Sequence, residues 1–241
     1  MKRAILLGSL ALIVGIASTS AYADSITFSL NTGGLCGTTC SPAAGQVVLT
    51  DIGANEVQVT ETLTSGYSFR QAPDSNHHSL VFSLTGVTGV DFSGLTDGPG
   101  SQTFLLNGIS SGSATAAAPG SFTAAGTGGG GFDYALECTT CSKGVPGTPT
   151  QTLTFDLTGV GGTLNVYSFV ANNGFFFASD VITLPSCQND KDCTAGGQTG
   201  NIGAIGGTVS HDPVPEPSTL VLLGTGLTGL GGLVRRKLAR S

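Results

Sequence analysis

The sequence has 241 residues, of which only 10% are charged, and glycine alone occupies 38 positions. All fifteen acidic residues but only three of the nine basic ones lie between Asp24 and Glu216, so this span has a formal charge of about −12. A span with this charge repels nucleic acid and anionic membranes, and neither is expected to bind it. Its length is sufficient for one domain with a hydrophobic core.

Residues 1–23 have the composition of a secretory signal peptide. A basic start precedes an apolar segment over residues 4–16, and Ala21 and Ala23 are the small residues of an Ala-x-Ala cleavage site. The short apolar segment disfavours the alternative, a first transmembrane helix. The sequence therefore predicts an N-terminal signal helix, export by the Sec machinery and a mature chain that begins at Asp24.

The period of hydrophobicity between residues 24 and 195 is two rather than 3.6. Apolar and polar residues alternate in Ile26-Phe28-Leu30, Val57-Val59, Leu80-Phe82-Leu84, Phe132-Tyr134-Leu136, Leu153-Phe155-Leu157 and Leu164-Val166. Turn sequences separate these segments, and Asn172-Asn173-Gly174 is a typical hairpin turn. We therefore expect an all-β fold, an antiparallel β-sandwich or jelly-roll-like domain, over residues 24–195.

One of these segments resembles another. The sequence LVFSLTGV at residues 80–87 is close to LTFDLTGV at residues 153–160. Two equivalent strands in opposing sheets explain the similarity, and so does chance among residues that are common in strands.

Six cysteines occur as three local pairs: Cys36 and Cys40, Cys138 and Cys141, and Cys187 and Cys193. An even number of cysteines in an exported chain indicates disulfides, and the simplest connectivity closes each pair locally. Two alternatives use the same residues, a Cys₄ zinc site from the first two pairs and a redox Cys-x-x-Cys. An oxidising compartment disfavours zinc, and the strand-like and glycine-rich flanks disfavour a redox motif, so we interpret the cysteines as structural disulfides.

Two stretches consist largely of glycine and small residues. Residues 110–131 contain almost only Gly, Ala, Ser and Thr, a composition that buries little surface and predicts a long mobile loop. Residues 196–213 have a similar composition and are expected to form a flexible linker between the domain and the C-terminal segment.

Candidate metal ligands are few. His77 and His78 are adjacent, and adjacent side chains of a strand point to opposite faces, so we expect a solvated loop there rather than a metal site. Asn189, Asp190 and Asp192 resemble a fragment of a calcium loop, but the turn glycine and the distal bidentate glutamate are missing. These three residues are a weak calcium candidate, and no cofactor is predicted.

Catalytic motifs are also scarce. The sequence has no phosphate-binding loop and no His-Glu-x-x-His zinc motif. A pair of glycosidase carboxylates stays possible, because their separation is a property of the fold. We therefore expect that the protein is not an enzyme.

The C-terminal segment has three parts in a fixed order. Val214-Pro215-Glu216-Pro217 is followed by an apolar run from Thr219 to Val234 and by the basic cluster Arg235-Arg236-Lys237. The prolines favour an extended tether, and Ser218 is suited to cap a helix. A helix of 16 residues would be about 24 Å long against about 30 Å of hydrocarbon, which makes it marginal as a permanent anchor. The basic cluster is expected to stop transfer and stay cytoplasmic.

This ordered set over residues 214–241 resembles a PEP-CTERM sorting signal. The resemblance implies recognition by an exosortase, an intramembrane cysteine peptidase, with Pro215, Glu216 and Pro217 as the recognition residues. It implies that the precursor is inserted transiently in the inner membrane and that the product reaches the surface or exterior of a Gram-negative-type bacterium. A plain C-terminal transmembrane anchor is the alternative interpretation.

Three classes of function are compatible with these observations. The resemblance implies a non-catalytic cell-surface or matrix protein associated with exopolysaccharide or biofilm, and we expect this class. A glycan-binding β-sandwich is the second; its aromatic candidates are Phe175-Phe176-Phe177, of which alternation would bury the first and third, and Tyr67, Tyr134 and Tyr167. A secreted hydrolase is the third and has the least support.

Overall fold

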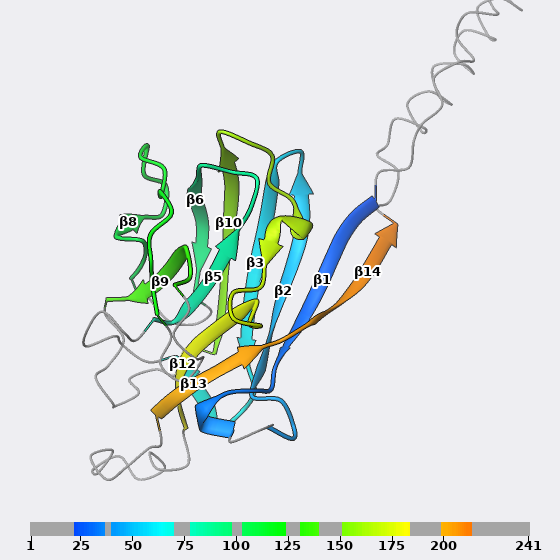
Figure 1. Ribbon diagram of the computed structural model, residues 1–241, viewed down its shortest axis with the longest axis vertical. Coiled ribbons are helices and arrows are strands. Elements are labelled where there is room, and N and C mark those ends of the chain that lie inside the picture. The colour runs from blue at the N-terminus through cyan, green and yellow to red at the C-terminus, as the bar shows by residue number, and fades with distance from the viewer. Residues whose placement is uncertain are drawn as a thin grey trace, which may run out of the picture. The chain divides into compact units, whose positions relative to one another are not determined.

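The structure is a computed structural model, and it describes residues 22–36, 40–69, 78–97, 103–123, 131–139, 151–183 and 199–213. Nearly all regular structure in these ranges is β-strand (Figure 1). The helical elements among them are two 3₁₀ helices, η1 (Gly34–Cys36) and η2 (Val166–Ser168). The chain divides into a compact unit, Asp24–Ser210, and a second unit made of residues 1–23 and 211–241.

The first sheet has six strands in the order β14-β1-β2-β3-β10-β6, and its pairs from β1 to β6 are antiparallel. The strands are β14 (Gly207–Pro213), β1 (Tyr22–Leu30), β2 (Gly45–Gly53), β3 (Glu56–Leu63), β10 (Thr152–Val160) and β6 (Gly89–Thr96). Alternation places the predicted apolar residues of β1, β3 and β10 on one buried face.

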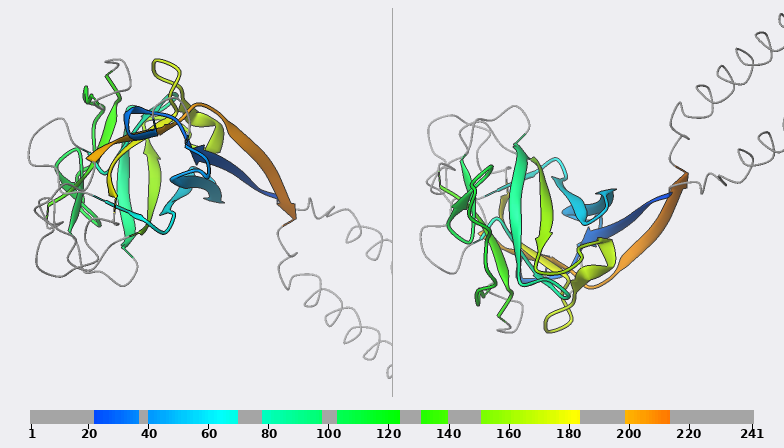
Figure 2. Two further views of the ribbon diagram at one scale, coloured as in Figure 1. Left: turned by 90° about the horizontal axis from the view of Figure 1, so that it is seen from below. Right: turned by 90° about the horizontal axis from the view of Figure 1, so that it is seen from above.

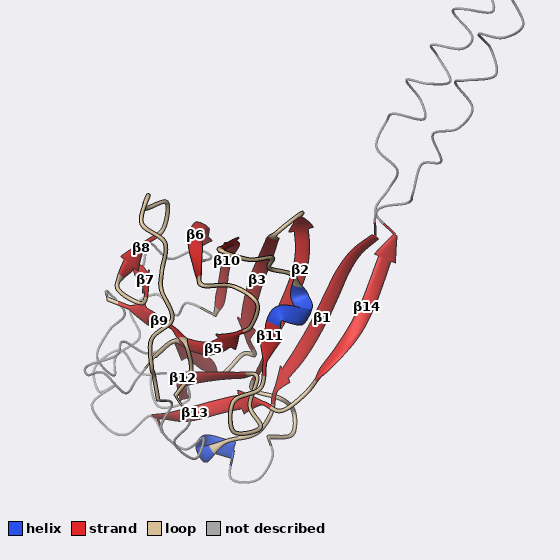
Figure 3. Ribbon diagram, turned by 45° about the horizontal axis from the view of Figure 1, so that its top comes forward, coloured by secondary structure: helices blue, strands red, loops and turns tan. Residues whose placement is uncertain are grey.

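The second sheet follows the path β13-β12-β5-β9-β7-β8, with β11 beside β5 and β4 beside β12. Its strands are β13 (Thr199–Ala204), β12 (Phe177–Thr183), β5 (Leu80–Leu84), β9 (Tyr134–Cys138), β7 (Phe104–Leu106), β8 (Ile109–Ser110), β11 (Phe169–Val170) and β4 (Tyr67–Phe69). All of these pairs are antiparallel. Figure 3 shows β5, β12 and β13 running across the direction of β1, β2 and β3.

The two sheets share one hydrophobic core. The ring centroid of Phe28 in β1 lies 5.0 Å from that of Phe177 in β12, and Phe82 in β5 lies 6.5 Å from Phe155 in β10. These contacts join side chains of opposite sheets, as in a β-sandwich. The jelly-roll alternative is not supported, because β1, β2 and β3 are neighbours in one sheet rather than alternating between two.

The two similar segments found in the sequence occupy opposite sheets. Residues 80–84 form β5 of the second sheet and residues 152–160 form β10 of the first. Phe82 and Phe155 hold the same position in the two segments and contact each other across the core. The similarity therefore corresponds to two strands that meet the same environment from opposite sides.

The segment Leu164-Val166 is not a strand, although both side chains are buried. Val166 begins η2, whose N-cap residue Asn165 accepts a hydrogen bond from the Tyr167 amide at 2.9 Å. The Val166 amide donates to Asp51 Oδ1 at 2.9 Å. The spacing of Leu164 and Val166 therefore predicted correctly that both side chains are buried. The segment is a 3₁₀ turn rather than a strand because its backbone amides donate to side chains instead of to a neighbouring strand.

The predicted turn at Asn172-Asn173-Gly174 is confirmed, but it does not join two paired strands. Asn173 and Gly174 have φ values of 49° and 84°, as a type I′ turn requires. Val170 pairs with Ser83 and Phe177 pairs with Phe82, so β11 and β12 follow one another along the same side of β5. Residues 171–176 therefore form a loop between β11 and β12, which both pair with the same side of β5.

The predicted flexible linker over residues 196–213 is wrong for its described part, because residues 199–204 and 207–213 form β13 and β14. The glycines serve close packing. A Cβ atom on Gly203 would lie 2.6 Å from Phe175 Cδ1, and one on Gly207 would lie 2.6 Å from Ile26 Cγ2. Small residues are needed where rings and branched chains cover these strands, so the compact unit extends to Ser210 rather than to residue 195.

The loop predicted over residues 110–131 is fixed by backbone hydrogen bonds in its described part. Ala117 exchanges hydrogen bonds with Val90 at 2.7 and 3.0 Å, and Phe122 does so with Phe132 at 2.7 and 2.8 Å. Ala117 and Phe132 are buried. Ala117 is the buried residue of 111–123 and most others are exposed, so the expectation that this composition buries little surface is confirmed there, while the hydrogen bonds hold the segment against its neighbours.

Candidate functional site

The predicted sorting residues Pro215, Glu216 and Pro217 lie outside the described residues, as do the apolar run after them, the basic cluster and Ala21. The helices that the structure describes are short 3₁₀ turns, and none of them has the length and apolar character to cross a membrane. What the structure does describe is where the two terminal segments leave the domain.

Both segments leave from neighbouring strands. β1 begins at Tyr22 and the compact unit begins at Asp24, the residue predicted to follow signal-peptide cleavage; residues 22–23 are therefore strand rather than signal helix. β14 ends at Pro213 and is the neighbour of β1 in the first sheet. The start of β1 and the end of β14 lie side by side in Figure 1 and in both views of Figure 2.

Two carboxylates meet beside the start of β1. Ser25 pairs with Thr50, and Asp24 and Asp51 are the neighbouring residues of the two strands beyond this pair. The pKa of Asp51 is raised by burial and by the charge of Asp24, while the hydrogen bond from the Val166 amide lowers it. Burial, a hydrogen bond to Asp24 and the charges of Asp24 and Asp51 raise the pKa of Tyr167, although this side chain is 51% exposed.

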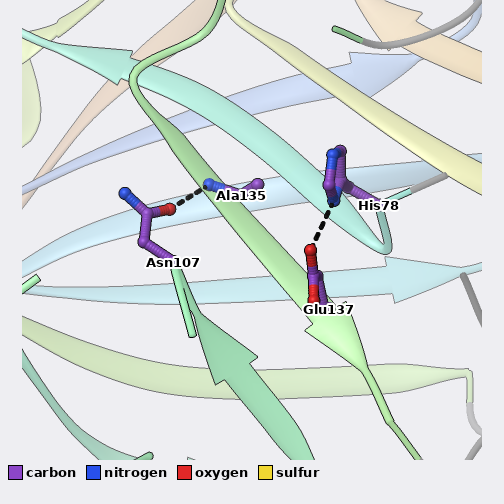
Figure 4. A network of polar contacts seen from close by, with 4 residues as sticks. All are labelled: His78, Asn107, Ala135 and Glu137. Atoms are coloured by element: carbon purple, nitrogen blue, oxygen red, sulfur yellow. Dashed lines mark hydrogen bonds and ion pairs between the residues drawn. The ribbon is translucent and has the colours of Figure 1, made fainter. Parts of the chain in front are cut away.

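His78 is buried, so the expectation of a solvated loop is wrong at this residue, and His77 lies outside the described residues. His78 Nδ1 lies 3.5 Å from Glu137 Oε1 of β9 (Figure 4). The His78 ring meets the Phe122 ring edge-on, with the ring centroids 5.3 Å apart. Its carbonyl accepts a hydrogen bond from the Asp180 amide at 3.0 Å. His78 thus joins β9, β12 and the segment of Phe122.

Asn107 supports the same region. Its Oδ1 accepts a hydrogen bond from the Ala135 amide at 2.8 Å (Figure 4). Its Nδ2 donates to the carbonyl groups of Ala118 and Asp133 at 2.8 and 3.1 Å. Within the described ranges, no group of three or more His, Cys, Asp or Glu side chains is arranged to hold a metal ion. The polar contacts of the buried His78 and the half-buried Asn107 thus fix neighbouring segments.

Glu61 is a core-facing acid that the sequence analysis missed. It follows Val57 and Val59 at the same spacing in β3 and is completely buried. Burial raises its pKa well above the ordinary value of 4.5, and the nearby Ser179 hydroxyl opposes this in part. Neither carboxyl oxygen of Glu61 has a hydrogen-bond partner among the described residues. Ser179 donates its own hydroxyl hydrogen to the Ser79 carbonyl at 2.6 Å. The sequence did contain a signal for this, because Glu61 continues the alternation of Val57, Val59 and Leu63 and so falls on the buried face of the strand.

The cysteines and the calcium candidate fall mostly outside the described side chains. Cys40 and Cys138 are disulfide-bonded, and a disulfide sulfur is not a thiolate ligand, which opposes the zinc alternative. The side chains of Cys36, Cys141, Cys187 and Cys193 are outside the description, so the connectivity stays a prediction. Asn189, Asp190 and Asp192 also lie outside it.

The pentapeptide Gly108-Ile109-Ser110-Ser111-Gly112 has the Gly-x-Ser-x-Gly spacing of a nucleophile elbow, a match that the sequence analysis overlooked. An elbow needs a strand-to-helix turn around its serine. Here Ser110 is an exposed residue of β8, pairs with Leu105 and is followed by a turn. The geometry is that of a surface hairpin and gives a hydrolase no support.

The aromatic candidates for sugar stacking differ in exposure. Phe177 is buried as expected, while Phe176 packs against Phe28 at 5.1 Å and Phe175 packs on a second cluster with Val81. Tyr134 is buried and Tyr67 is half-buried. Tyr167 is thus the one tyrosine with an exposed ring among the described residues.

Comparison with known proteins gives a match at the C-terminal end of the chain. Residues 213–237 match the family described as the PEP-CTERM protein-sorting motif. Neither a curated protein nor a solved structure matches the chain. The match begins at Pro213, the last residue of β14, so the domain and the motif are directly continuous. The chain therefore carries a PEP-CTERM protein-sorting motif over residues 213–237.

Proposed function

We propose that the protein is exported by the Sec machinery, processed by an exosortase and delivered to the cell surface or extracellular matrix of a Gram-negative-type bacterium. The observation that carries the proposal is the sorting motif, which begins where β14 ends. In this proposal the precursor is held in the membrane only transiently, by residues 219–234. Export supplies an oxidising compartment, in which the three cysteine pairs close as local disulfides.

The mature domain in this proposal is non-catalytic and associates with exopolysaccharide or biofilm. Support comes from two of the described titratable groups, Glu61 and His78, which lie inside the packed structure rather than at an open surface. The negative charge of the mature span suits a soluble protein of a hydrated matrix.

The test is the intact mass and location of the protein in its native host, with and without replacement of Pro215, Glu216 and Pro217 by alanine. We expect the wild type outside the cell without either terminal segment, and the variant in the membrane with its C-terminal segment intact. A wild type that keeps residues up to Ser241 in the membrane, with identical behaviour of the variant, contradicts processing by an exosortase and favours a plain anchor.

Glycan binding is a second candidate, favoured by Tyr167, whose exposed ring lies beside two carboxylates. Such modules stack a sugar ring on an aromatic side chain and bind its hydroxyls with polar neighbours. A glycan array with the wild type and Tyr167→Ala tests it. Binding that is lost in the variant supports a glycan-binding module, and no binding by either protein rejects it.

A further inference from the structure

The chain contains two Asn-Gly turns with the same backbone geometry. Asn107-Gly108 joins β7 to β8, and Asn173-Gly174 lies in the loop between β11 and β12. Each turn is closed by an antiparallel pair of residues on either side of it. The φ values are 49° and 81° in the first turn and 49° and 84° in the second, as type I′ turns require. The two asparagines can therefore be compared without a difference in turn type.

The side chain of the first asparagine is fully engaged. Asn107 is half-buried, and its Oδ1 accepts a hydrogen bond from the Ala135 amide at 2.8 Å. Its Nδ2 donates to the Ala118 carbonyl at 2.8 Å and to the Asp133 carbonyl at 3.1 Å. Any reaction that requires this side chain to rotate must first break all three hydrogen bonds.

The side chain of the second asparagine is open to solvent. Asn173 and Gly174 are both exposed, and the Asn173 side chain makes no hydrogen bond to any residue that the structure describes. A Cβ atom on Gly174 would meet nothing within 4 Å, and the same is true of Gly108. The main chain is thus equally uncrowded in the two turns, and the difference lies in the asparagine side chains.

An Asn-Gly sequence can deamidate without an enzyme, since glycine has no side chain to hinder the attack. The glycine amide nitrogen loses its proton to water and bonds to Cγ of the asparagine, while the bond from Cγ to Nδ2 breaks and that nitrogen leaves with a proton as ammonia. The product is a cyclic succinimide. One water molecule then opens the ring at Cγ to give aspartate, or at the main-chain carbonyl carbon to give isoaspartate. No atom is oxidised or reduced in either step.

We propose that Asn173 is a site of spontaneous deamidation, and that Asn107 in the matching turn is protected by its three hydrogen bonds. The inference goes beyond the sorting of the protein and does not depend on it. Either product adds a negative charge, and isoaspartate also adds a carbon atom to the main chain of a turn that has room for two residues.

The isoaspartate product has a structural consequence for β13. The turn is held by the Asn172 and Phe175 backbones, which exchange hydrogen bonds at 2.8 and 3.0 Å. A longer main chain between these two residues disturbs that pairing. The Phe175 ring lies against Gly203 of β13, where an added Cβ atom would approach its Cδ1 to 2.6 Å. Deamidation at residue 173 therefore loosens the packing over this strand.

The experiment follows deamidation of both asparagines in the protein purified from its native host. The folded protein is aged at mildly alkaline pH in ¹⁸O-labelled water, and a parallel sample is aged in urea with its disulfides reduced. Tandem mass spectrometry of tryptic peptides then locates each modified residue, because Asn107 falls in residues 71–143 and Asn173 in residues 144–191. The sample in urea measures the rate that each local sequence has without the fold.

We expect Asn173 to deamidate about 10–100 times faster than Asn107 in the folded protein, since each hydrogen bond of Asn107 slows the reaction by a factor of about 5. In urea the two rates should become similar. Equal rates in the folded protein overturn the inference. So does an Asn173 that stays intact in the folded protein but reacts in urea.

Asn173→Gly is the matched variant for the structural consequence, because glycine accepts the positive φ and cannot deamidate. Hydrogen exchange of residues 199–204 is measured before and after ageing. We expect ageing to speed this exchange in the wild type and to leave the variant unchanged. An equal effect of ageing on both proteins overturns the consequence for β13.

Discussion

The carboxyl group of Glu61 in β3 and the hydroxyl of Ser179 in β12 face each other inside the core that the two sheets share. Each residue occupies a core-facing position of its strand, where its neighbours are valine, phenylalanine and leucine. An ionised carboxylate at this position would lack the hydrogen bonds that water supplies. The raised pKa of Glu61 means that the folded protein holds this group protonated over a wider range of pH.

Glu61→Gln should stabilise the protein at neutral and alkaline pH. The pKa of Glu61 is higher in the folded chain than the ordinary 4.5, so the folded state binds more protons and stability falls as pH rises above that value. Glutamine stays neutral and has a similar shape. We expect a gain of about 1–3 kcal/mol at pH 8 and little difference at pH 4, measured by urea unfolding. Glu56→Gln, near the start of the same strand, is the control and should change stability by less than about 0.5 kcal/mol. A pH-independent effect of Glu61→Gln contradicts the argument.

Gly203→Ala should destabilise the domain by about 1–3 kcal/mol, because the added methyl group would meet the Phe175 ring and the Phe177 carbonyl of the adjacent segment. Gly206→Ala is the matched control, since a Cβ atom at Gly206 meets nothing within 4 Å. Thermal unfolding of both variants measures the difference. Equal melting temperatures would indicate that residues 199–204 form the flexible linker expected from composition and not a packed strand.

Alternation of apolar residues predicted five of the six segments correctly as strands or their immediate ends, because side chains of one strand face share one environment. The sixth, Leu164-Val166, was wrong for a reason that the alternation of apolar residues does not reveal. The amides of Leu164 and Val166 donate to Asn55 and Asp51, and both acceptors are more than a hundred residues away in the chain. The spacing of apolar residues indicates which side chains are buried. Whether the backbone forms a strand or a turn depends on hydrogen-bond acceptors that can be distant in the sequence.

The glycine-rich segments escaped prediction for a different reason. Composition indicates how much surface a segment buries by itself, whereas Gly203 and Gly207 are packed because Phe175, Ile26 and Phe28 cover them. The sorting motif, in contrast, could be identified from the sequence alone. Its order of prolines, apolar run and basic cluster is local in sequence and needs no fold, so it was identified from sequence and matched over residues 213–237. The proximity of Asp24 to Asp51 depends on the pairing of β1 with β2, which joins residues far apart in the sequence.

Asn55 closes the β2–β3 turn and should tolerate glycine better than alanine. It has a φ of 87°, its Nδ2 donates to the Gly159 carbonyl at 2.8 Å, and its Oδ1 accepts the Leu164 amide at 2.6 Å. Asn55→Gly keeps the backbone conformation but loses both hydrogen bonds, at about 1 kcal/mol each. Asn55→Ala loses the same bonds and adds about 1 kcal/mol of left-handed strain. Chemical unfolding checks this order, and equal stability of the two variants contradicts the role of φ.

Tyr134→Phe should leave the domain as stable or more stable at neutral pH. The Tyr134 ring stacks on Phe82 at 5.4 Å, while its hydroxyl is buried and has no hydrogen-bond partner among the described residues. Removing an unsatisfied buried hydroxyl is expected to gain about 0.5–1 kcal/mol or to be neutral.

Burial and the charge of Asp133 raise the pKa of Tyr134 to about 12. The unfolded chain releases this proton near pH 10, so in the wild type this group's contribution to stability falls as pH rises from about 10 to about 12, and in the variant it does not. Ultraviolet titration at high pH should show one late-ionising tyrosine in the wild type that is missing from Tyr134→Phe. A variant that is clearly less stable than the wild type would mean that the hydroxyl has a partner, most simply a water molecule or a residue beyond those described.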